Sequence, residues 1–543
     1  MLNVNGEYSS LAVEVLSRAL NDPNRAAFCK ISNDASAGRW FGWGQIGGWV
    51  CDACEALESL SLPIGTHLAT VARNSVEWFV LDFACQALGY VHVAIDHRWP
   101  EVMVGTLIEH SCSQVVYIPQ SQPSVELQAK NRVHQLEWRF DLDLPPISKP
   151  ELQKWLRRAA LISDELPAQM LFTSGTSGQP KGVLLSHRNL VSNAWAKLDA
   201  APQVEDDLRL NILPFCHAYA RTCELSTWVL SNSRLAIATD WDDFLRQASV
   251  LRPTLINLVP HLANKLVHQT NTKEQLQPHE IAARLGGQVR LLQVGGAAIS
   301  DDLWHALANS GLPPLQGYGL TEASPVVCSN RAGEQRPGRI GPPVMGVELR
   351  VDAVGQLWVR GEGVMLGYHR NPTATQTRIQ DGWLATGDLV DLDELGHYRV
   401  TGRLSEVMVL STGLKVSPES IEGRMEAVEG IERAVLVGES RPYLVALIWP
   451  AWRDLPNHLF VDGTRDPASL NLARFHAQLT DWVRGVLSDL PAYALPRKFI
   501  VVWNEVDSNL FTAKGSLRRQ AVIVHFQAQI DEAYAVTANI SDL

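Results

Sequence analysis

The stretch LFTSGTSGQPKGVLLSH, from Leu171 to His187, carries the pattern that decides the fold assignment. Apolar residues typical of a strand lead into Thr, Ser and Gly residues, which reach a single lysine before the chain becomes apolar again. Backbone amides in such a loop can converge on an anion, glycines allow close approach, and a lysine can neutralise phosphate charge. The pattern predicts a polyphosphate-binding loop. Its candidate binding residues are Thr173, Ser174, Gly175, Thr176, Ser177, Gly178 and Lys181.

This loop differs from the Walker A type of phosphate loop. The Walker A pattern is G-x-x-x-x-G-K-[ST] ahead of a helix. Here Pro180 precedes Lys181, and the run GVLLSH that follows indicates a strand. A flexible surface hairpin is the alternative interpretation of a Gly- and Ser-rich loop, but this loop is longer and more specific than a generic one, which favours phosphate binding.

Length and charge limit the classes of protein that fit this chain. Its 543 residues are too many for one ordinary core, so two or more domains are expected. With 47 basic and 58 acidic residues the net charge is −11, which argues against a nucleic-acid partner. The apolar stretch from Trp78 to Ile95 is interrupted by Asp82 and Gln86, which favours a buried helix and strand over a transmembrane segment.

The first residues and the cysteines indicate a cytoplasmic location. MLNVNGEYSS lacks the basic and then apolar pattern of a signal peptide. Cys51 and Cys54 form a C-x-x-C pair, but no second pair completes a zinc site, and their helical surroundings predict structural packing. A reduced set of thiols is the simplest interpretation, and reduced thiols are typical of the cytoplasm.

Short apolar runs alternate with helix-length segments between about residues 65 and 300. This alternation predicts an α/β fold of parallel strands layered with helices. From about 337 to 402, Gly, Pro and short strands predict a small β-rich, barrel-like unit, and a mixed pattern returns after Arg403. The expected strands are THLATVA (66–72), VHVAID (91–96), QVVYIP (114–119), AQMLFT (168–173), LRLNIL (208–213), LAIAT (235–239), TLINLVP (254–260) and VRLLQVG (289–295).

The segment TSGTSGQPKG (173–182) resembles the signature of the adenylate-forming, or AMP-binding, superfamily. That superfamily contains acyl-CoA synthetases, peptide-synthetase adenylation domains and luciferases. The resemblance covers most of the chain because further family motifs follow in the expected order. It implies an enzyme that joins a carboxylate to ATP, releases pyrophosphate and passes the acyl group to a thiol, with ATP, Mg²⁺ and CoA as the cofactors.

LPFCHAYA (213–220) resembles the family motif whose histidine lies between the carboxylate pocket and the thiol tunnel, so His217 is a candidate catalytic residue. Amino-acid-activating relatives carry an Asp beside a Phe here, whereas Cys216 follows Phe215, which points to a substrate without an α-amine. LLQVGGAAIS (291–300) ends a predicted strand with two glycines, a sign of close backbone approach. By resemblance, the adenine and acyl pockets are lined by Gly295, Gly296 and Ala297.

LQGYGLTEASPVV (315–327) is a second strong match to the family. Tyr318 can stack on adenine, Thr321 can bond the α-phosphate, and Glu322 can hold Mg²⁺. One well-placed carboxylate is enough, because Mg²⁺ on ATP takes one or two carboxylates plus phosphate oxygens. The other candidate nucleotide-binding residues of this motif are Gln316, Gly317 and Gly319.

DGWLATGDLV (381–390) resembles the family's ribose-binding motif. Asp388 can accept hydrogen bonds from both ribose hydroxyls, and Arg403 can reach ribose or phosphate, although a surface ion pair is the alternative. LSTGLKVSPESIE (410–422) contains Lys415, and its spacing after Arg403 is one residue longer than in aryl-acid relatives. It resembles the long-chain fatty acyl type, so a fatty or other apolar carboxylate is the expected substrate.

One family position departs from the pattern. Relatives carry a lysine in L-x-x-T-x-x-G-K-[IL]-x-R that contacts the reacting carboxylate, whereas LFTAKGSLRR (510–519) has Ser516 there. Serine cannot supply the cation, and such electrostatic contributions amount to several kcal/mol. Lys514, on the same side of a strand, is the preferred substitute, and Lys415 is the other. At the hinge, Ser405 stands where Asp or Lys is common.

These features predict an α/β enzyme of two domains, nearest to long-chain fatty acid–CoA ligases. Residues 1–402 are expected to hold ATP and the acyl pocket and to include the β-barrel-like unit at about 337–402. Residues 403–543 are expected to form a smaller, mobile α+β lid. The expected partners are a small-molecule carboxylic acid, ATP and CoA. Two alternatives remain, namely a ligase that loads the phosphopantetheine of an acyl carrier protein, and an acyl- or nucleotide-binding protein with impaired adenylation.

Overall fold

The computed structural model divides the chain into two compact units. The first unit comprises residues 1–353, 357–386 and 391–400, and the second comprises residues 354–356, 387–390 and 401–543. The structure describes residues 9–31, 38–119, 133–173, 180–268, 276–404, 407–412, 414–416, 418–452, 454–461, 469–488, 490–502, 510 and 518–535.

The first unit contains an eight-stranded sheet that is parallel except at its edges. Strands β1, β10, β9, β11, β12 and β13 run parallel, while β2 and β14 pair antiparallel at the two edges. In sheet order the strands are β14 (Val326–Ser329), β13 (Leu315–Gly319), β12 (Leu291–Val294), β11 (Leu255–Leu258), β9 (Leu208–Asn211), β10 (Arg234–Ile237), β1 (Ala26–Lys30) and β2 (Arg39–Gly42).

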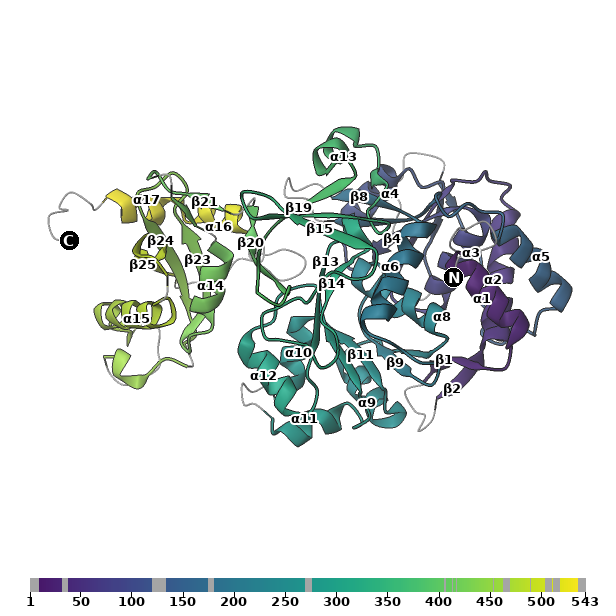
Figure 1. Cartoon of the computed structure of the whole chain (residues 1–543), viewed down its shortest axis with the longest axis horizontal. Helices are drawn as coiled ribbons and strands as arrows, with labels where there is room; N and C mark the ends of the chain where they lie inside the picture. The colour runs from purple at the N-terminus through teal and green to yellow at the C-terminus, as the bar shows by residue number, and fades with distance from the viewer. Residues whose placement is uncertain are drawn as a thin grey trace. The chain divides into compact units, whose positions relative to one another are not determined.

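Four helices pack along one side of this sheet, beside β9 and β11 (Figure 1). Their apolar faces and the strands share one large core. These helices are α9 (Trp241–Leu251), α10 (Pro260–Val267), α11 (Pro278–Arg284) and α12 (Asp301–Asn309).

A second, seven-stranded sheet in the first unit carries the hairpin of interest. Strands β7, β4, β3, β5 and β6 run parallel, β8 pairs antiparallel with β7, and β17 pairs antiparallel with β8. In sheet order the strands are β17 (Gly367–Tyr368), β8 (Lys181–Ser186), β7 (Pro167–Thr173), β4 (Val91–Asp96), β3 (His67–Ala72), β5 (Val115–Tyr117) and β6 (His134–Gln135). Helix α4 (Glu101–Ser111) packs against the core of this sheet.

The strands expected from the sequence are confirmed; β4 has the expected bounds, and the others differ by one or two residues at one or both ends. The apolar stretch from Trp78 onward forms helix α3 (Val76–Leu88) followed by β4, and both Cys51 and Cys54 are buried in helix α2 (Trp43–Glu58). Strand β9 ends at Asn211, two residues earlier than expected, and the side-chain amide of Asn211 donates to the Leu213 carbonyl at 3.0 Å.

Helix α6 (His187–Ala200) links elements of both sheets. It starts directly after β8 with a capping box between Ser186 and Asn189, and almost all of its residues are buried. It packs against the π-helical turn η1 (Arg221–Ser226), helix α8 (Thr227–Ser231), strand β8 and strand β14. Further helices of the first unit are α1 (Leu11–Asn21), α5 (Lys149–Ala159), α7 (Ala218–Ala220) and α13 (Pro372–Arg378), and the short turn η2 spans Thr321–Ala323.

A five-stranded sheet occupies the region expected to be β-rich. Its strands are β15 (Val347–Val351), β16 (Gln356–Gly361), β19 (Trp383–Leu392) and β18 (Ile379–Gln380), with β20 (Tyr398–Arg403) paired to β19.

The second unit is built on a three-stranded sheet that is covered on both faces. Leu444, Ala446 and Ile448 of its central strand enter one core, and the alternating residues of that strand enter another. The strands are β23 (Ile431–Val437), β24 (Leu444–Pro450) and β25 (Pro496–Val501), beside the hairpin β21 (Met408–Val409) and β22 (Lys415–Val416). The helices are α14 (Pro418–Glu426), α15 (Leu472–Val486), α16 (Arg519–His525) and α17 (Gln527–Ala535).

Among the helices that the structure describes, none combines the length and the apolar character that a membrane span requires.

Candidate active site

The turn that carries Glu322 is held on three sides. The Asn193 side chain on α6 donates to the Val326 carbonyl at 2.7 Å and accepts from the Val326 amide at 3.0 Å. The Thr222 hydroxyl on η1 donates to a carbonyl of the same turn at 2.7 Å. The amide of Met365 donates to the Glu322 carbonyl at 2.9 Å. The backbone on either side of the predicted metal ligand is therefore fixed.

Tyr368 contacts two of the predicted site residues. Its hydroxyl donates to Oε1 of Glu322 at 2.7 Å, and Nζ of Lys181 lies 5.1 Å from the centre of its ring. Burial, followed by the charge of Glu322, raises the pKa of the Tyr368 phenol, so the hydroxyl stays protonated and donates. The structure thus brings together Lys181 and Glu322, which are far apart in the sequence, around one aromatic ring.

The predicted phosphate loop connects two strands, as the sequence indicated. Thr173 ends β7 and faces Lys181, the first residue of β8, so both stand at the loop end of the β7–β8 hairpin. The remaining predicted loop residues lie outside the described residues, and they are Ser174, Gly175, Thr176, Ser177 and Gly178.

Gly295 follows β12 and lies against the aromatic ring of Tyr219. A Cβ atom on Gly295 would stand 3.0 Å from Cζ of Tyr219, so the close approach depends on the glycine. Gly296 has a φ of 85° and is exposed together with Ala297. Tyr219 in turn packs with an apolar cluster that includes Cys223. The predicted adenine- and acyl-pocket residues therefore adjoin an apolar region.

The residues Gln316, Gly317, Tyr318 and Gly319 form the end of β13. A Cβ atom on Gly319 would lie only 1.9 Å from the Pro325 carbonyl oxygen, so glycine is required there. Gln316 is buried, and within the described part of the chain its Oε1 atom has no hydrogen-bond partner. A buried amide oxygen without a partner is costly, and it is an acceptor that a bound ligand can satisfy.

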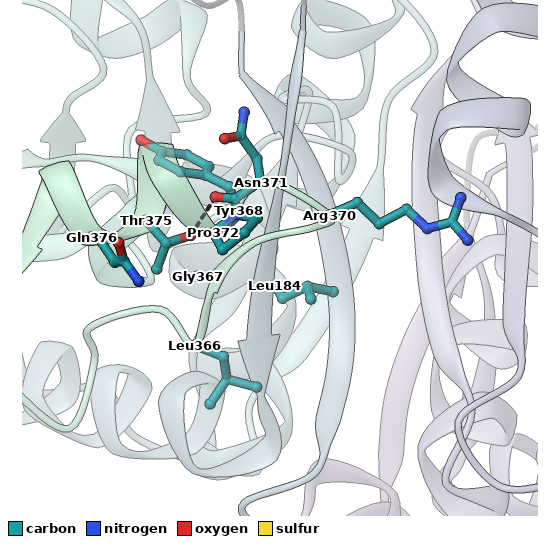
Figure 2. Close-up of a pocket in the computed structure, with 9 residues that line it drawn as sticks. All are labelled: Leu184, Leu366, Gly367, Tyr368, Arg370, Asn371, Pro372, Thr375 and Gln376. Atoms are coloured by element: carbon teal, nitrogen blue, oxygen red, sulfur yellow. Dashed lines mark hydrogen bonds between the residues drawn. The ribbon is translucent and has the colours of Figure 1, made fainter.

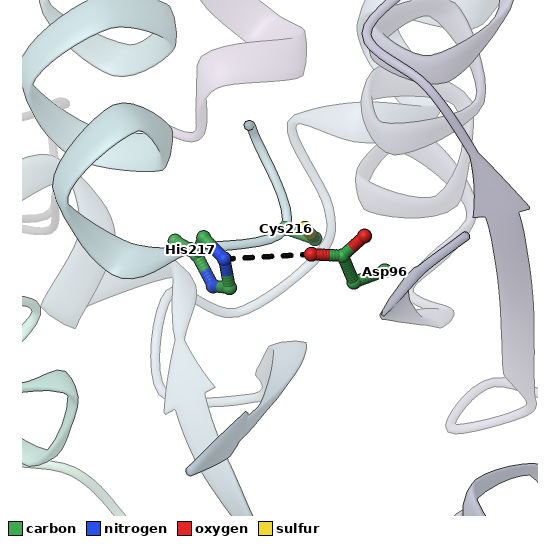
Figure 3. Close-up of side chains that lie close together, drawn as sticks. All are labelled: Asp96, Cys216 and His217. Carbon is green, nitrogen blue, oxygen red and sulfur yellow. Dashed lines mark ion pairs between the residues drawn. The ribbon is translucent and has the colours of Figure 1, made fainter. Parts of the chain in front are cut away.

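His217 lies beside Asp96, at the carboxyl end of β4. Nε2 of His217 is 3.5 Å from Oδ2 of Asp96 (Figure 3), and the His217 side chain is 41% exposed. Asn74, just after β3, places this segment by donating to the Leu213 carbonyl at 2.7 Å and accepting from the Phe215 amide at 2.8 Å. The candidate catalytic histidine is therefore accessible and has a carboxylate beside it.

Asp96, Cys216 and His217 place their ligand-type atoms within 4.8 Å of one another. Arg98 donates to both carboxylate oxygens of Asp96, at 2.9 and 2.5 Å, and although burial raises the pKa of Asp96, these bonds hold it below its usual value. Burial also raises the pKa of the Cys216 thiol, which stays protonated. A carboxylate bound by a guanidinium and a neutral thiol are poor metal ligands. The group is therefore better explained as a contact by which Asp96 orients His217 than as a metal site.

Buried charges support the segment that follows His217. The amide of Arg221 donates to the His217 carbonyl at 2.9 Å, and its guanidinium bonds the fully buried carboxylate of Asp82 at 2.8 Å. Glu224, one turn further, lies 3.6 Å from the guanidinium of Arg209. Burial raises the pKa of Glu224 to about 7, against the opposing effect of Arg209. These pairs fix η1 and with it the start of the His217 segment.

The second unit holds the predicted ribose-binding pair. Arg403 Nε lies 3.0 Å from Oδ1 of Asp388, whose side chain is 5% exposed, whereas the Arg403 side chain is 55% exposed. The carboxylate is thus oriented by an arginine that remains accessible. Lys415 belongs to strand β22, and its side chain lies outside the described residues.

The segment in which Ser516 takes the place of the family's lysine is flanked by the described residues Leu510 and Arg518. The Arg518 amide donates to the Leu510 carbonyl at 2.7 Å, and Arg519 forms two hydrogen bonds of 2.5 Å with Glu422. Lys514 and Ser516 lie outside the described residues, as does Ser405 at the predicted hinge.

Sequence reasoning missed three residues of this site, namely Asp96, Tyr219 and Tyr368. Asp96 had a usable signal, because polar residues at the carboxyl ends of parallel strands commonly face a ligand site. Tyr219 lay inside a quoted motif, two positions after His217. Tyr368 had no local signal, because only the pairing of β17 with β8 brings it to Lys181.

This two-unit fold is that of the adenylate-forming enzymes. The crystal structure of ATP-bound MatB from Rhodopseudomonas palustris matches with a TM-score of 0.74 at 23% identity, over 95% of this chain and 99% of that chain. The crystal structure of the anthranilate CoA ligase AuaEII in complex with anthranoyl-AMP matches with the same TM-score at 20% identity, over 97% of this chain and 98% of that chain.

The chain belongs to the AMP-binding enzyme family, whose model matches residues 16–369, and the model of the AMP-binding enzyme C-terminal domain matches residues 405–538. A long-chain-fatty-acid–CoA ligase of Mycobacterium bovis is 28% identical over 502 residues, which are 82% of each chain. A feruloyl-CoA synthase of Amycolatopsis sp. is 27% identical over 409 residues, which are 72% of this chain and 79% of the relative. The protein is thus an enzyme of this family.

Proposed function

We propose that the enzyme activates an apolar carboxylic acid, in the first place a fatty acid, with ATP and transfers the acyl group to the thiol of CoA. The observation that carries the proposal is the grouping of Lys181 and Glu322 around Tyr368, at the loop end of the β7–β8 hairpin. This grouping combines a cation suited to phosphate with a carboxylate suited to the metal ion of a nucleotide.

The donor set fits a magnesium ion carried by ATP. One oxygen of Glu322 accepts the Tyr368 hydroxyl, and the other has no hydrogen-bond partner among the residues that the structure describes. A single carboxylate oxygen is enough, since Mg²⁺ on ATP completes its shell with phosphate oxygens and water. When bound, Mg²⁺ neutralises charge on the polyphosphate.

In the proposed reaction the acid's carboxylate attacks the α-phosphorus, pyrophosphate leaves, and a thiol then displaces AMP from the acyl-adenylate. Lys181 pairs with the polyphosphate, Thr321 positions the α-phosphate, and Asp388 binds the ribose hydroxyls. His217 stands between the acid and the entering thiol. Most of the catalytic effect is then positioning and charge stabilisation. The domain boundary near 402–405 and the role of residues 403–543 as a mobile lid remain predictions.

An apolar acid is supported by the surroundings of Gly295. Tyr219 packs there in a cluster with Ala196, Cys223, Val326 and Val344. The residue beside Phe215 is Cys216, whose thiol burial keeps neutral. This position therefore offers no negative charge to an ammonium group of a substrate. The relative named for long-chain fatty acids supports a fatty acid, and the relative named for a feruloyl group makes aryl acids the comparison to test.

A screen of carboxylate-dependent exchange of pyrophosphate into ATP tests the proposal. Fatty acids of graded length are compared with aryl and amino acids, and the best acid is then assayed with CoA and with a purified acyl carrier protein. We expect exchange with fatty acids and thioester formation with free CoA. Turnover with the carrier protein alone would replace CoA as the acceptor. Absence of exchange with every acid would leave the binding-protein alternative.

The same assay locates the cation that replaces the missing lysine. We expect Lys514→Ala to lower exchange strongly and Lys415→Ala to lower it less, because the charge at the reacting carboxylate is then lost. Full exchange by Lys514→Ala together with loss by Lys415→Ala would assign the role to Lys415.

A further inference from the structure

We propose that Tyr368 is a positioning residue that holds Glu322 and Lys181 apart and ready for a magnesium–nucleotide complex. The inference rests on the proposed function and adds a residue to that site. It starts from one geometric fact, because the hydroxyl of Tyr368 contacts the carboxylate while its ring faces the ammonium.

Tyr368 is itself firmly placed. Its strand pairs with β8, where Tyr368 stands opposite Val183, and its amide donates to the Thr375 hydroxyl at 2.9 Å. Figure 2 shows the Tyr368 side chain directed away from that of Arg370, at the edge of a pocket of about 380 Å³. The tyrosine is 7% exposed. Its hydroxyl therefore reaches Glu322 from a rigid support.

The hydroxyl fixes one carboxylate oxygen. A tyrosine is protonated at neutral pH, so the bond to Glu322 is a donation to a charged acceptor, which is stronger than a neutral hydrogen bond. It restricts rotation of the carboxylate and leaves the second oxygen of Glu322 for a cation. Removing the hydroxyl alone leaves the carboxylate free to rotate.

The ring faces one charge, and its hydroxyl contacts the opposite one. Lys181 and Glu322 are both described and form no ion pair with one another, although each touches Tyr368. Without the ring, the ammonium could fold onto the carboxylate, and each group would lose the charge that it offers to the nucleotide. The aromatic face instead attracts the ammonium and keeps it beside the hairpin.

Two substitutions separate these roles. Tyr368→Phe keeps the ring and removes the hydroxyl, whereas Tyr368→Leu removes both. Tyr90→Phe is the matched control, because the hydroxyl of Tyr90 also donates to an oxygen, the Leu62 carbonyl at 3.0 Å, and Tyr90 is 3% exposed. Thermal melts of each variant report whether it is folded.

Equilibrium binding of ATP by calorimetry, at a series of Mg²⁺ concentrations, is the main readout, and pyrophosphate exchange is the second. For Tyr368→Phe we expect the Mg²⁺ concentration at half-saturation to rise about tenfold, the low end of what one hydrogen bond to a charged group contributes. For Tyr368→Leu we expect, in addition, weaker binding of ATP without Mg²⁺, because Lys181 is no longer available. Tyr90→Phe should match the wild type in both.

The outcomes are distinguishable. Unchanged Mg²⁺ dependence in a folded Tyr368→Phe protein, beside a wild type that binds Mg²⁺–ATP, would overturn the inference. If Tyr368→Leu does not fold, Tyr368→Phe alone decides. A wild type that binds Mg²⁺–ATP but exchanges pyrophosphate with no acid would overturn the proposed function only, and the binding data would still decide on Tyr368. A wild type that binds no Mg²⁺–ATP would overturn both.

Discussion

Nε2 of His217 lies 3.5 Å from the carboxylate of Asp96, although the two residues come from different sheets of the first unit. Asp96 ends a parallel strand of the seven-stranded sheet, and His217 follows β9 of the eight-stranded one. The junction of the two sheets thus determines which way the imidazole faces.

We expect Asp96→Asn to impair transfer to the thiol more than acid activation. The amide would leave the His217 ring without its charged neighbour, and a misplaced group commonly costs up to 10²-fold in rate. CoA-dependent turnover should fall about tenfold while pyrophosphate exchange falls less. Asp164→Asn is the control, because that carboxylate is also held by two hydrogen bonds, from Arg188 at 3.1 and 3.0 Å. Equal losses in both half-reactions would contradict the assignment.

Lys181→Met is expected to lower kcat/KM for ATP by about 10²-fold, because one preorganised charge at a transferring phosphate contributes on that order. The measurement is pyrophosphate exchange over a range of ATP concentrations. Lys265→Met is the matched control, since Lys265 also faces an aromatic ring, that of Trp241, at 5.7 Å. Similar kinetics for both variants would exclude Lys181 from phosphate binding.

Gly295→Ala should alter the choice of acid. The new methyl group would stand 3.0 Å from Tyr219 Cζ and force the ring to move, and such overpacking typically costs 1–3 kcal/mol. We expect the relative kcat/KM values for long and short acids to change several-fold, and a second change, Tyr219→Leu, to relieve the crowding. Gly105→Ala, where the Cβ would meet nothing within 4 Å, is the control. If the relative kcat/KM values for long and short acids did not change, Tyr219 would not be part of the acyl pocket.

The buried Glu224 makes stability depend on pH. Its pKa is raised to about 7 in the folded state, from a usual value of 4.5, so the folded protein binds the proton more tightly than the unfolded chain does. The corresponding stabilisation is complete below pH 4.5 and is lost as the pH rises through 7, by about 3 kcal/mol. Glu224→Gln carries no titrating group at this position and keeps its stability as the pH rises. The melting temperature of Glu224→Gln minus that of the wild type should therefore increase from pH 5 to pH 8. The exposed control Glu109→Gln should show the same dependence of melting temperature on pH as the wild type. If Glu224→Gln also showed the wild-type dependence, the raised pKa of Glu224 would be refuted.

The sequence was informative where the signal is local. The β7–β8 hairpin was predictable because Pro180 and the apolar run after Lys181 favour a strand over a helix. The parallel strands were predictable because their apolar runs have the length of buried strands. Gly319 was identified as a site residue, and the structure adds the steric reason, the Pro325 carbonyl.

What the sequence could not supply were the contacts made by distant segments. Nothing near Tyr368 indicates that its hydroxyl meets Glu322, since that contact depends on a two-residue strand and on a turn held by Asn193. In the same way, the partner of His217 depends on where two sheets meet, which local periodicity does not encode.

The direct continuation of β8 into α6 has a mechanical consequence. Lys181 opens the strand, Ser186 caps the helix, and Asn193 on that helix grips the backbone on which Glu322 sits. Lys181 and Glu322 are therefore both attached to one continuous unit, β8 followed by α6. A tilt of this unit would move both side chains together and preserve the distance between them.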